Sequence, residues 1–92
     1  MVYIAWLGAK TYATAIRAAK MLRAAGIGVE LPPTEQKFGK ALERASKLAA
    51  GYALLLGEDE VATGVWTLKN LADGKQDKMK DSEAIAFLRG GF

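Results

Sequence analysis

The hydrophobic positions of this chain fall into short continuous runs separated by stretches with helical spacing. Residues 2–7 and 52–56 are apolar runs too short for a core helix, and each is followed by a glycine or ends next to one, so both are predicted to be fully buried strands. Apolar side chains recur at about 100° per residue over 9–25 and again over 35–50, which predicts two amphipathic helices. A third extended run, 27–31, is followed by two prolines that cannot donate to a sheet ladder.

The two predicted helices each have an apolar face and a glycine at the end. We expect Gly26 to end the first helix and Gly51 to end the second. The side chains that should face the core are Tyr12, Ala15, Ile16, Ala19 and Leu22 in the first helix, and Phe38, Ala41, Leu42, Ala45, Leu48 and Ala49 in the second.

The last third of the chain predicts a hairpin and one more helix. Residues 64–70 mix β-branched and aromatic side chains, and an Asp-Gly turn at 73–74 leads into another strand at about 75–79. The Asp-Ser pair at 81–82 is expected to cap a last helix, and 89–92 should form a tail. The apolar side chains that this helix should return to the core are Ile85, Phe87 and Leu88.

This order of elements predicts the topology of the sheet. Parallel strands joined by right-handed helical crossovers place the first three strands in the order 2-1-3, and the hairpin extends the sheet beyond the third. The expected fold class is therefore α/β, a three-layer α/β/α domain with a mixed five-stranded sheet of order 2-1-3-4-5 and an antiparallel fourth strand. Ninety-two residues, 51% hydrophobic and 25% charged, fit one such domain over 1–92.

Two residue types are missing from the chain, and their absence excludes many common catalytic mechanisms. The chain has no cysteine and no histidine, so disulfides, thiolate zinc sites and histidine-based catalysis are excluded. The apolar run at the N-terminus is far short of the roughly 20 residues that a membrane span needs, and no basic leader precedes it. We therefore expect a soluble, cytoplasmic protein with no membrane partner.

The net charge of +3 is unevenly distributed. Residues 1–50 carry eight basic and three acidic side chains, whereas residues 51–92 carry five and seven. Four of the cations lie within about 80° of arc on the second predicted helix. They are Lys37, Lys40, Arg44 and Lys47. Such a stripe can neutralise the phosphates of a nucleic acid, but it can equally be the solvated side of a core-facing helix, and the pattern alone favours neither.

Three consecutive acids, Glu58, Asp59 and Glu60, directly follow the buried strand 52–56. We call these three residues the acidic corner. In open sheets of this kind ligands bind beyond the carboxyl ends of the strands, where the winding direction reverses. The carboxylates could accept hydrogen bonds from a nucleic-acid base, or they could simply form the N-terminus of a helix with favourable dipole contacts. Trp66 could stack on a base, although strand alternation favours its burial.

Two segments carry a family resemblance that extends along almost the whole chain. They are Gly-Glu-Asp-Glu-Val-Ala-Thr-Gly at 57–64 and Thr-Leu-Lys-Asn-Leu-Ala-Asp-Gly-Lys-Gln at 67–76. Together with the strand ending at Gly8, the Ala-rich first helix and the helix that begins near Lys37, they resemble the C-terminal anticodon-binding domain of histidyl-tRNA synthetases. Residues 1–60 alone are also similar to the related domains of the threonyl, prolyl and glycyl enzymes.

The resemblance implies a function and a set of binding residues. It implies a three-layer anticodon-binding fold that docks on the anticodon stem-loop of a tRNA. In such domains the last acid of the corner and a basic residue near the end of the next strand contact bases, while the start of the second helix lies near the RNA backbone. The implied tRNA-binding residues are Lys37, Lys40, Arg44, Glu58, Glu60 and Lys69. No catalytic or metal-binding residue is implied.

The resemblance also implies what a larger parent protein would do. No segment here resembles the catalytic motifs of these enzymes, so ATP and magnesium are expected only in the catalytic domain of the parent. We expect an excised domain of a histidine–tRNA ligase, homodimeric in the parent and monomeric alone. The alternatives are a freestanding regulatory domain that binds protein, and a small flavodoxin-like ligand binder. The second would need a phosphate loop, whereas this sequence has acids where a phosphate would lie.

Overall fold

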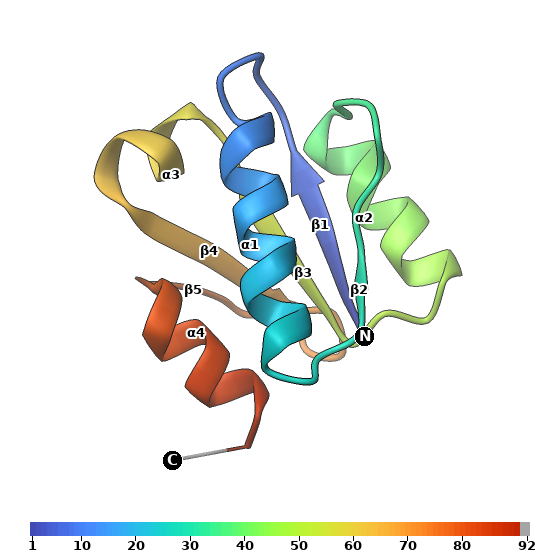
Figure 1. Cartoon of the computed structure of the whole chain (residues 1–92). Coiled ribbons are helices and arrows are strands. Elements are labelled where there is room, and N and C mark those ends of the chain that lie inside the picture. The colour runs from blue at the N-terminus through green and yellow to red at the C-terminus, as the bar shows by residue number, and fades with distance from the viewer. Residues whose placement is uncertain (91–92) are drawn as a thin grey trace.

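The structure of the chain is a computed structural model that describes residues 1–90. These residues form one mixed sheet flanked by helices (Figure 1). The strands are β1 Val2–Trp6, β2 Val29–Glu30, β3 Tyr52–Leu56, β4 Val65–Asn70 and β5 Gln76–Lys80. The helices are α1 Tyr12–Ala24, α2 Phe38–Lys47, α3 Glu58–Thr63 and α4 Asp81–Leu88.

The predicted sheet topology is confirmed. The strands lie in the order β2-β1-β3-β4-β5, with β1 parallel to both of its neighbours. Strand β4 is antiparallel to β3 and to β5, as a hairpin requires. The five residues of β1 pair one for one with the five of β3, so these two strands end side by side. The segments that follow them, at Leu7 and Gly57, therefore meet at one edge of the sheet.

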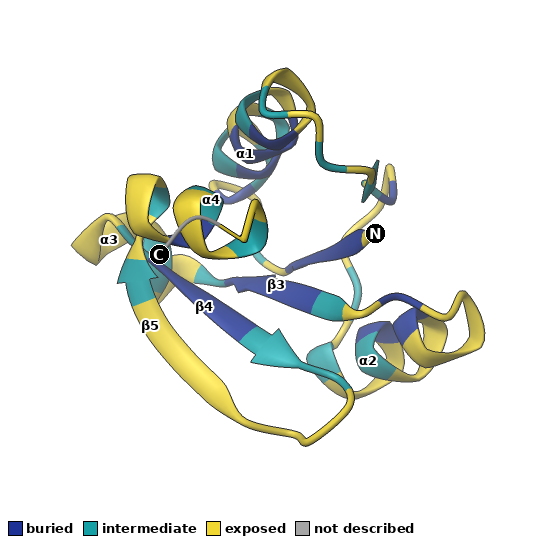
Figure 2. Cartoon of the chain, turned by 90° about the horizontal axis from the view of Figure 1, so that it is seen from below, coloured by how far each residue is buried: buried dark blue, intermediate teal, exposed yellow. Residues whose placement is uncertain are grey.

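Alternation along the strands divides the core into two layers. Figure 2 shows α1 and α4 on one side of the sheet and α2 on the other. Toward α1 and α4, the sheet presents its larger side chains to alanines and one leucine of those helices. These side chains include Ile4, Leu54, Leu56, Trp66 and Leu68. Toward α2, a smaller cluster joins Tyr3, Ala5, Ala53 and Leu55 to Ala41 and Ala45. The result is the expected three-layer α/β/α arrangement.

Both long helices end in the same hydrogen-bonded cap, and this sets their length. In α1, Gly26 has a φ of 81° and the Ile27 N–H donates to the Leu22 carbonyl. In α2, Ala49 has a φ of 57° and the Ala50 N–H donates to the Ala45 carbonyl. These are Schellman caps, which favour glycine at the left-handed position. Gly26 ends α1 as predicted.

The expected end of α2 at Gly51 is wrong, because Ala49 already adopts the left-handed conformation of the cap. The predicted burial at the end of this helix is also wrong. Leu48 is 39% exposed and Ala49 lies at the surface. Phe38 and Leu42 are partly buried, so α2 covers the sheet mainly through its alanines. Small side chains let the helix approach the strands closely.

The starts of both helices come about three residues later than predicted. Before α1, Gly8 has a φ of 112°, and the Thr11 N–H donates to the Gly8 carbonyl to close a turn. Before α2, the chain is held along β1, because the Gln36 N–H donates to the Trp6 carbonyl and the Trp6 Nε1–H donates to the Pro32 carbonyl. These hydrogen bonds hold residues 32–36 against β1 before the helix begins. Strand β2 is also shorter than the predicted run 27–31, because only two residues form it.

The sequence interpretation did not include α3 as an element, and it misplaced the cap of α4. In α4 the Glu83 carboxylate accepts the Lys80 N–H at 3.0 Å, whereas the Asp81 carboxylate accepts the Ser82 N–H. Ile85 and Leu88 pack on the core as expected, but Phe87 is 37% exposed and meets the Tyr52 ring edge-on. Within the expected tail 89–92, the backbone N–H groups of 89 and 90 cap α4, and 91–92 lie outside the described residues.

Candidate nucleic-acid interface

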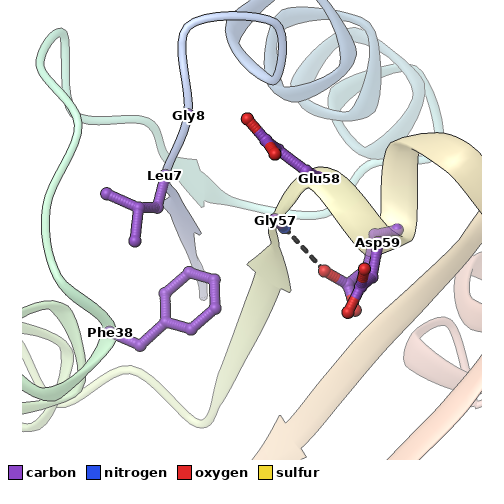
Figure 3. A pocket seen from close by; sticks show the side chains of 7 residues that line it. Leu7, Gly8, Phe38, Gly57, Glu58 and Asp59 are labelled. Carbon is purple, nitrogen blue, oxygen red and sulfur yellow. Dashed lines mark hydrogen bonds between the residues drawn. The ribbon is translucent and has the colours of Figure 1, made fainter.

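A cleft of about 460 Å³ lies at the carboxyl ends of β1 and β3. Figure 3 shows an apolar wall from Leu7 and the Phe38 ring, facing a polar wall from the acidic corner. The cleft therefore sits where the strand order reverses, the place where open α/β sheets bind their ligands. It also brings the acidic corner next to the start of α2, which the sequence separates by some twenty positions.

Two glycines let the walls of this cleft approach each other. A Cβ added at Gly57 would lie 3.1 Å from the Glu60 Oε1 atom and 3.6 Å from the Phe38 ring. A Cβ added at Gly8 would lie 3.2 Å from the side chain of Glu58. Any side chain at either position would therefore crowd the cleft. At both strand ends the close neighbours are the chain's own side chains.

Glu35 and Gln36 fix the position of α2 beside the cleft. The Glu35 carboxylate accepts the Gly8 N–H at 2.9 Å, and the Gln36 side-chain oxygen accepts the Tyr3 hydroxyl at 2.7 Å. Burial raises the pKa of Tyr3 above its ordinary value, against the opposing effect of Arg44. Sequence reasoning missed these two hydrogen bonds, because they connect polar residues of one loop to β1 and to Gly8 and leave no periodic signal.

The three acids of the corner have different surroundings. Glu60 Oε1 accepts the Gly57 N–H at 2.6 Å, and Glu60 Oε2 accepts the Thr67 hydroxyl at 3.0 Å. Lys78 Nζ lies 4.0 Å from the same oxygen, and the Glu60 side chain is only 11% exposed. By contrast, Glu58 and Asp59 are exposed, and no side-chain hydrogen bond or ion pair within residues 1–90 engages their carboxylates. The helix N-terminus that we considered as one reading of the corner is present, as the first turn of α3.

The cations of α2 lie beside this cleft and not inside it. Lys37 is the N-cap residue of α2, next to Phe38 in the cleft wall. A second groove, of about 210 Å³, is lined by Gln36, Lys40, Glu43, Arg44 and Lys47. Lys47 pairs with Glu43 at 3.7 Å, but both side chains are largely exposed, so this pair contributes little to stability. Within the described residues Lys37 and Lys40 have no ion pair.

Lys69 lies on the same face of the sheet as Thr67 but further from the corner. The two residues are two positions apart in β4, about 7 Å along the strand. Lys69 pairs with Ala53 at the beginning of β3, toward the opposite edge from the cleft. The structure therefore places Glu58 and Glu60 in the cleft next to the start of α2, Lys40 and Arg44 in a second groove along α2, and Lys69 further along β4 of the same sheet.

Sequence analysis missed two lysines at this surface, and the structure excludes the stacking of a base on Trp66. Strand β5 places Lys78 and Lys80 on the face of Lys69, and the alternating pattern of 76–80 carried that signal. Trp66 is 5% exposed, so it is buried as alternation predicted and does not offer its ring to a base. No group of three or more acidic side chains within residues 1–90 is arranged to hold a metal ion.

Comparison with known proteins identifies the family to which the chain belongs. A family described as the anticodon binding domain matches residues 1–90. The chain belongs to the anticodon-binding domain family. This confirms the resemblance found in the sequence, and the cleft lies at the acidic corner, the most specific part of that resemblance.

The curated relatives of this anticodon-binding domain are histidine–tRNA ligases. It is 37% identical over 87 residues to the ligase of Koribacter versatilis, a match that covers 95% of this chain and 20% of that protein. It is 50% identical over 62 residues to the ligase of Methanosphaerula palustris, covering 67% of this chain and 15% of that protein. The chain spans about a fifth of the length of the first relative.

Solved structures share the fold. The histidyl-tRNA synthetase of Nostoc matches 97% of this chain and 20% of its own, with a TM-score of 0.89 and 22% identity. The RNA-binding domain of threonyl-tRNA synthetase from Cryptosporidium parvum matches 100% of this chain and 24% of its own, with a TM-score of 0.90 and 20% identity. At these identities the likeness concerns the fold alone. No helix within residues 1–90 has the length and apolar character needed to cross a membrane.

Proposed function

We propose that this domain binds the anticodon stem-loop of a histidine tRNA and positions that tRNA for ATP-dependent aminoacylation by a catalytic domain of a larger histidine–tRNA ligase. The observation that carries the proposal is the cleft at the acidic corner, in a chain 37% identical to such a ligase over 95% of its length. The cleft combines an aromatic ring, two exposed carboxylates without a partner in residues 1–90 and a neighbouring cationic groove.

The chemistry of the cleft suits unpaired bases. Single-stranded RNA bases are recognised by stacking on aromatic rings and by hydrogen bonds to their edges. The Phe38 ring offers a surface for stacking, and the Glu58 carboxylate can accept hydrogen bonds from a base that presents N–H groups. Glu60 would act differently, because its two oxygens already accept hydrogen bonds from within the chain. We infer that it supports the cleft wall and contacts RNA only through groups that it holds in place.

The cations would provide most of the affinity. Lys37, Lys40 and Arg44 lie at the start and along the exposed side of α2, where they can approach the phosphates of the same loop. Contacts of this kind are independent of sequence and weaken as salt displaces them. Lys69 would contribute from β4. The domain would therefore separate its two tasks, with affinity in α2 and discrimination in the cleft.

A pair of variants tests this division of roles. The 92-residue chain is titrated with a hairpin RNA that carries the histidine anticodon loop, and with hairpins that carry other anticodons. Lys40→Ala should weaken every hairpin by a similar factor, because it removes a phosphate contact. Glu58→Ala should reduce the difference between anticodons, because it removes a base contact. Lys20→Ala, which removes an exposed cation from α1, serves as the control and should change neither.

The reverse pattern would overturn the assignment of roles. If Lys40→Ala altered discrimination and Glu58→Ala weakened all hairpins equally, bases would be read at α2 and not in the cleft. Failure of the unsubstituted chain to bind any hairpin at low salt would remove the proposal itself.

We further propose the setting in which the domain works. ATP and magnesium would act only in the catalytic domain of the larger enzyme, which we place in the cytoplasm as a homodimer. The isolated domain should be a monomer, since association through its sheet would cover the proposed RNA surface. Light scattering on the 92-residue chain checks this, and a stable dimer would favour a protein-binding role.

A further inference from the structure

One face of the β4–β5 hairpin has no helix over it. Helix α2 packs on β1 and β3, and Figure 2 shows that the corresponding face of β4 and β5 is left uncovered in the described chain. The register pairs Lys80 with Val65, Lys78 with Thr67, and Gln76 with Lys69. Side chains of directly paired residues in antiparallel strands lie on the same face. We call the surface formed by Lys69, Gln76, Lys78 and Lys80 around the buried Thr67 the open face.

Charge on β5 is sorted between its two faces. Lys78 and Lys80 lie on the open face, while the intervening Asp77 and Met79 point toward α4. Among the hydrogen bonds and ion pairs of residues 1–90, the acid that reaches the open face is Glu60, whose carboxylate is mostly buried and already accepts two hydrogen bonds. Lys78 is 66% exposed, and its 4.0 Å contact with Glu60 is too long and too exposed to hold it strongly. The open face is therefore positively charged.

Lysines on an edge strand also protect a sheet against pairing with another molecule. That explanation fits β5, which is the last strand in the order. It does not account for Lys69, because β4 is an interior strand paired on both sides. Nor does it account for the sorting, since a charge on either face of β5 would protect the edge equally well. The arrangement of the three lysines calls for a further explanation.

We propose that the open face binds the phosphate backbone of the same RNA whose loop occupies the cleft, so that the footprint continues from the acidic corner across β4 and β5. The inference rests on the proposed function. Thr67 joins the two surfaces, because its hydroxyl donates to Glu60 of the corner while its partner across β5 is Lys78. Lys78 and Lys80 are two positions apart, about 7 Å along the strand, and can therefore contact successive groups of an extended chain.

The proposed contact is with phosphates and not with bases. The surface offers ammonium groups at its centre, which are strong donors to phosphate oxygens but carry no pattern that distinguishes one base from another. Its effect should thus be the same for every RNA sequence. This separates the open face from the cleft, where discrimination is expected.

The test compares two double variants of equal net charge in the 92-residue chain. Lys78→Ala/Lys80→Ala removes two cations from the open face, and Lys20→Ala/Arg23→Ala removes two exposed cations from α1. With the histidine-anticodon hairpin, the first should lower affinity roughly three- to tenfold at low salt and reduce the slope of log affinity against log salt by about 1.4 to 1.8. The second should leave both unchanged. Hairpins with other anticodons should lose affinity by the same factor.

A charge-preserving variant guards against loss of structure. Lys78→Arg/Lys80→Arg should retain the affinity of the unsubstituted chain, because it keeps two cations on the open face. Unchanged affinity in the Lys78→Ala/Lys80→Ala variant would overturn the inference, as would a loss confined to particular anticodons. Loss of binding to vesicles of anionic lipid with RNA binding intact would assign the face to a membrane and also overturn it.

The outcome can be separated from that of the proposed function. If Lys40→Ala weakens hairpin binding while Lys78→Ala/Lys80→Ala does not, only the open-face inference fails. If the unsubstituted chain binds no hairpin, both fail.

Discussion

Glu60 connects three parts of the chain through one carboxylate. It accepts the Gly57 N–H before α3 and the Thr67 hydroxyl of β4, and it lies near Lys78 of β5. The resemblance to synthetases implied a base contact for this residue, and the sequence could not reveal its internal partners because they come from three separate elements. Through these contacts Glu60 links the acidic corner to β4 and β5.

Substitutions of Glu60 should therefore change stability according to whether they keep the acceptors. Glu60→Ala leaves the buried Thr67 hydroxyl and the Gly57 N–H without their acceptor, and it should lower the free energy of unfolding by about 1–2 kcal/mol. Glu60→Gln keeps an oxygen acceptor and an amide able to donate to Thr67, so its effect should be smaller, roughly half. Urea unfolding of both variants measures this difference. Equal losses in the two would contradict a hydrogen-bonded support.

Tyr3 provides a second prediction, which depends on pH. Burial raises the pKa of Tyr3 above 10.0, so the folded chain favours the neutral phenol. Its contribution to stability should be fully present below the unfolded pKa and should be lost as the pH rises through the folded pKa. At about pH 8, the Tyr3→Phe variant should be less stable than the unsubstituted chain by roughly 0.5–1.5 kcal/mol, because it lacks the hydrogen bond to Gln36.

The difference between Tyr3→Phe and the unsubstituted chain should shrink or reverse as the pH approaches about 11. Urea unfolding of both proteins at the two pH values gives the comparison, and the variant itself controls for the lysines that also titrate. A difference that stays constant with pH would show that Tyr3 does not contribute through its ionisation.

At the scale of elements, the sequence predicted the existence and order of the helices and strands better than their boundaries. Hydrophobic runs identified β1 and β3, because burial of both faces leaves a continuous apolar signal over residues such as Leu54 and Leu55. Strands β4 and β5 were predicted from strand propensity and from the Asp-Gly turn between them. The sequence analysis considered a helix N-terminus at the acidic corner but did not assign α3 as an element, because this helix buries none of its six residues and so has no apolar periodicity. The start of α2 was misplaced because hydrogen bonds to β1, invisible in the sequence, hold the preceding loop.

The two Schellman caps give a matched pair of variants. Ala49 adopts the left-handed conformation that Gly26 adopts at the end of α1, and alanine is strained there. Ala49→Gly should therefore raise the free energy of unfolding by roughly 0.5–1 kcal/mol, equivalent to a few degrees in Tm. Gly26→Ala should lower it by a similar amount, since no neighbour lies within 4 Å and backbone strain is the main effect.

Thermal unfolding followed by circular dichroism measures both changes. Ala86→Gly, in the exposed interior of α4, is the control for the ordinary effect of glycine in a helix and should be destabilising by about 1 kcal/mol. If Ala49→Gly were destabilising to the same degree, the conformation at position 49 would differ from the one described.

At the scale of the whole molecule, folding rearranges the charges that the sequence presents. Counted along the chain, the second half is acidic, yet it contributes Lys69, Lys78 and Lys80 to the open face. Strand alternation sends Asp77 to the opposite side, which a count of charges by segment cannot detect. The candidate site was thus predicted in part. The acidic corner and the cations of α2 were found from motifs, whereas the open face depends on strand register.

The central claim is that this surface recognises the anticodon loop of a histidine tRNA. The most direct measurement is a titration of the unsubstituted 92-residue chain with two hairpins that differ only in their anticodon bases, each at several salt concentrations. We predict tighter binding of the histidine anticodon at every salt concentration, and a linear fall of log affinity with log salt for both hairpins. Equal affinity for the two anticodons, or affinity that does not change with salt, would contradict the claim.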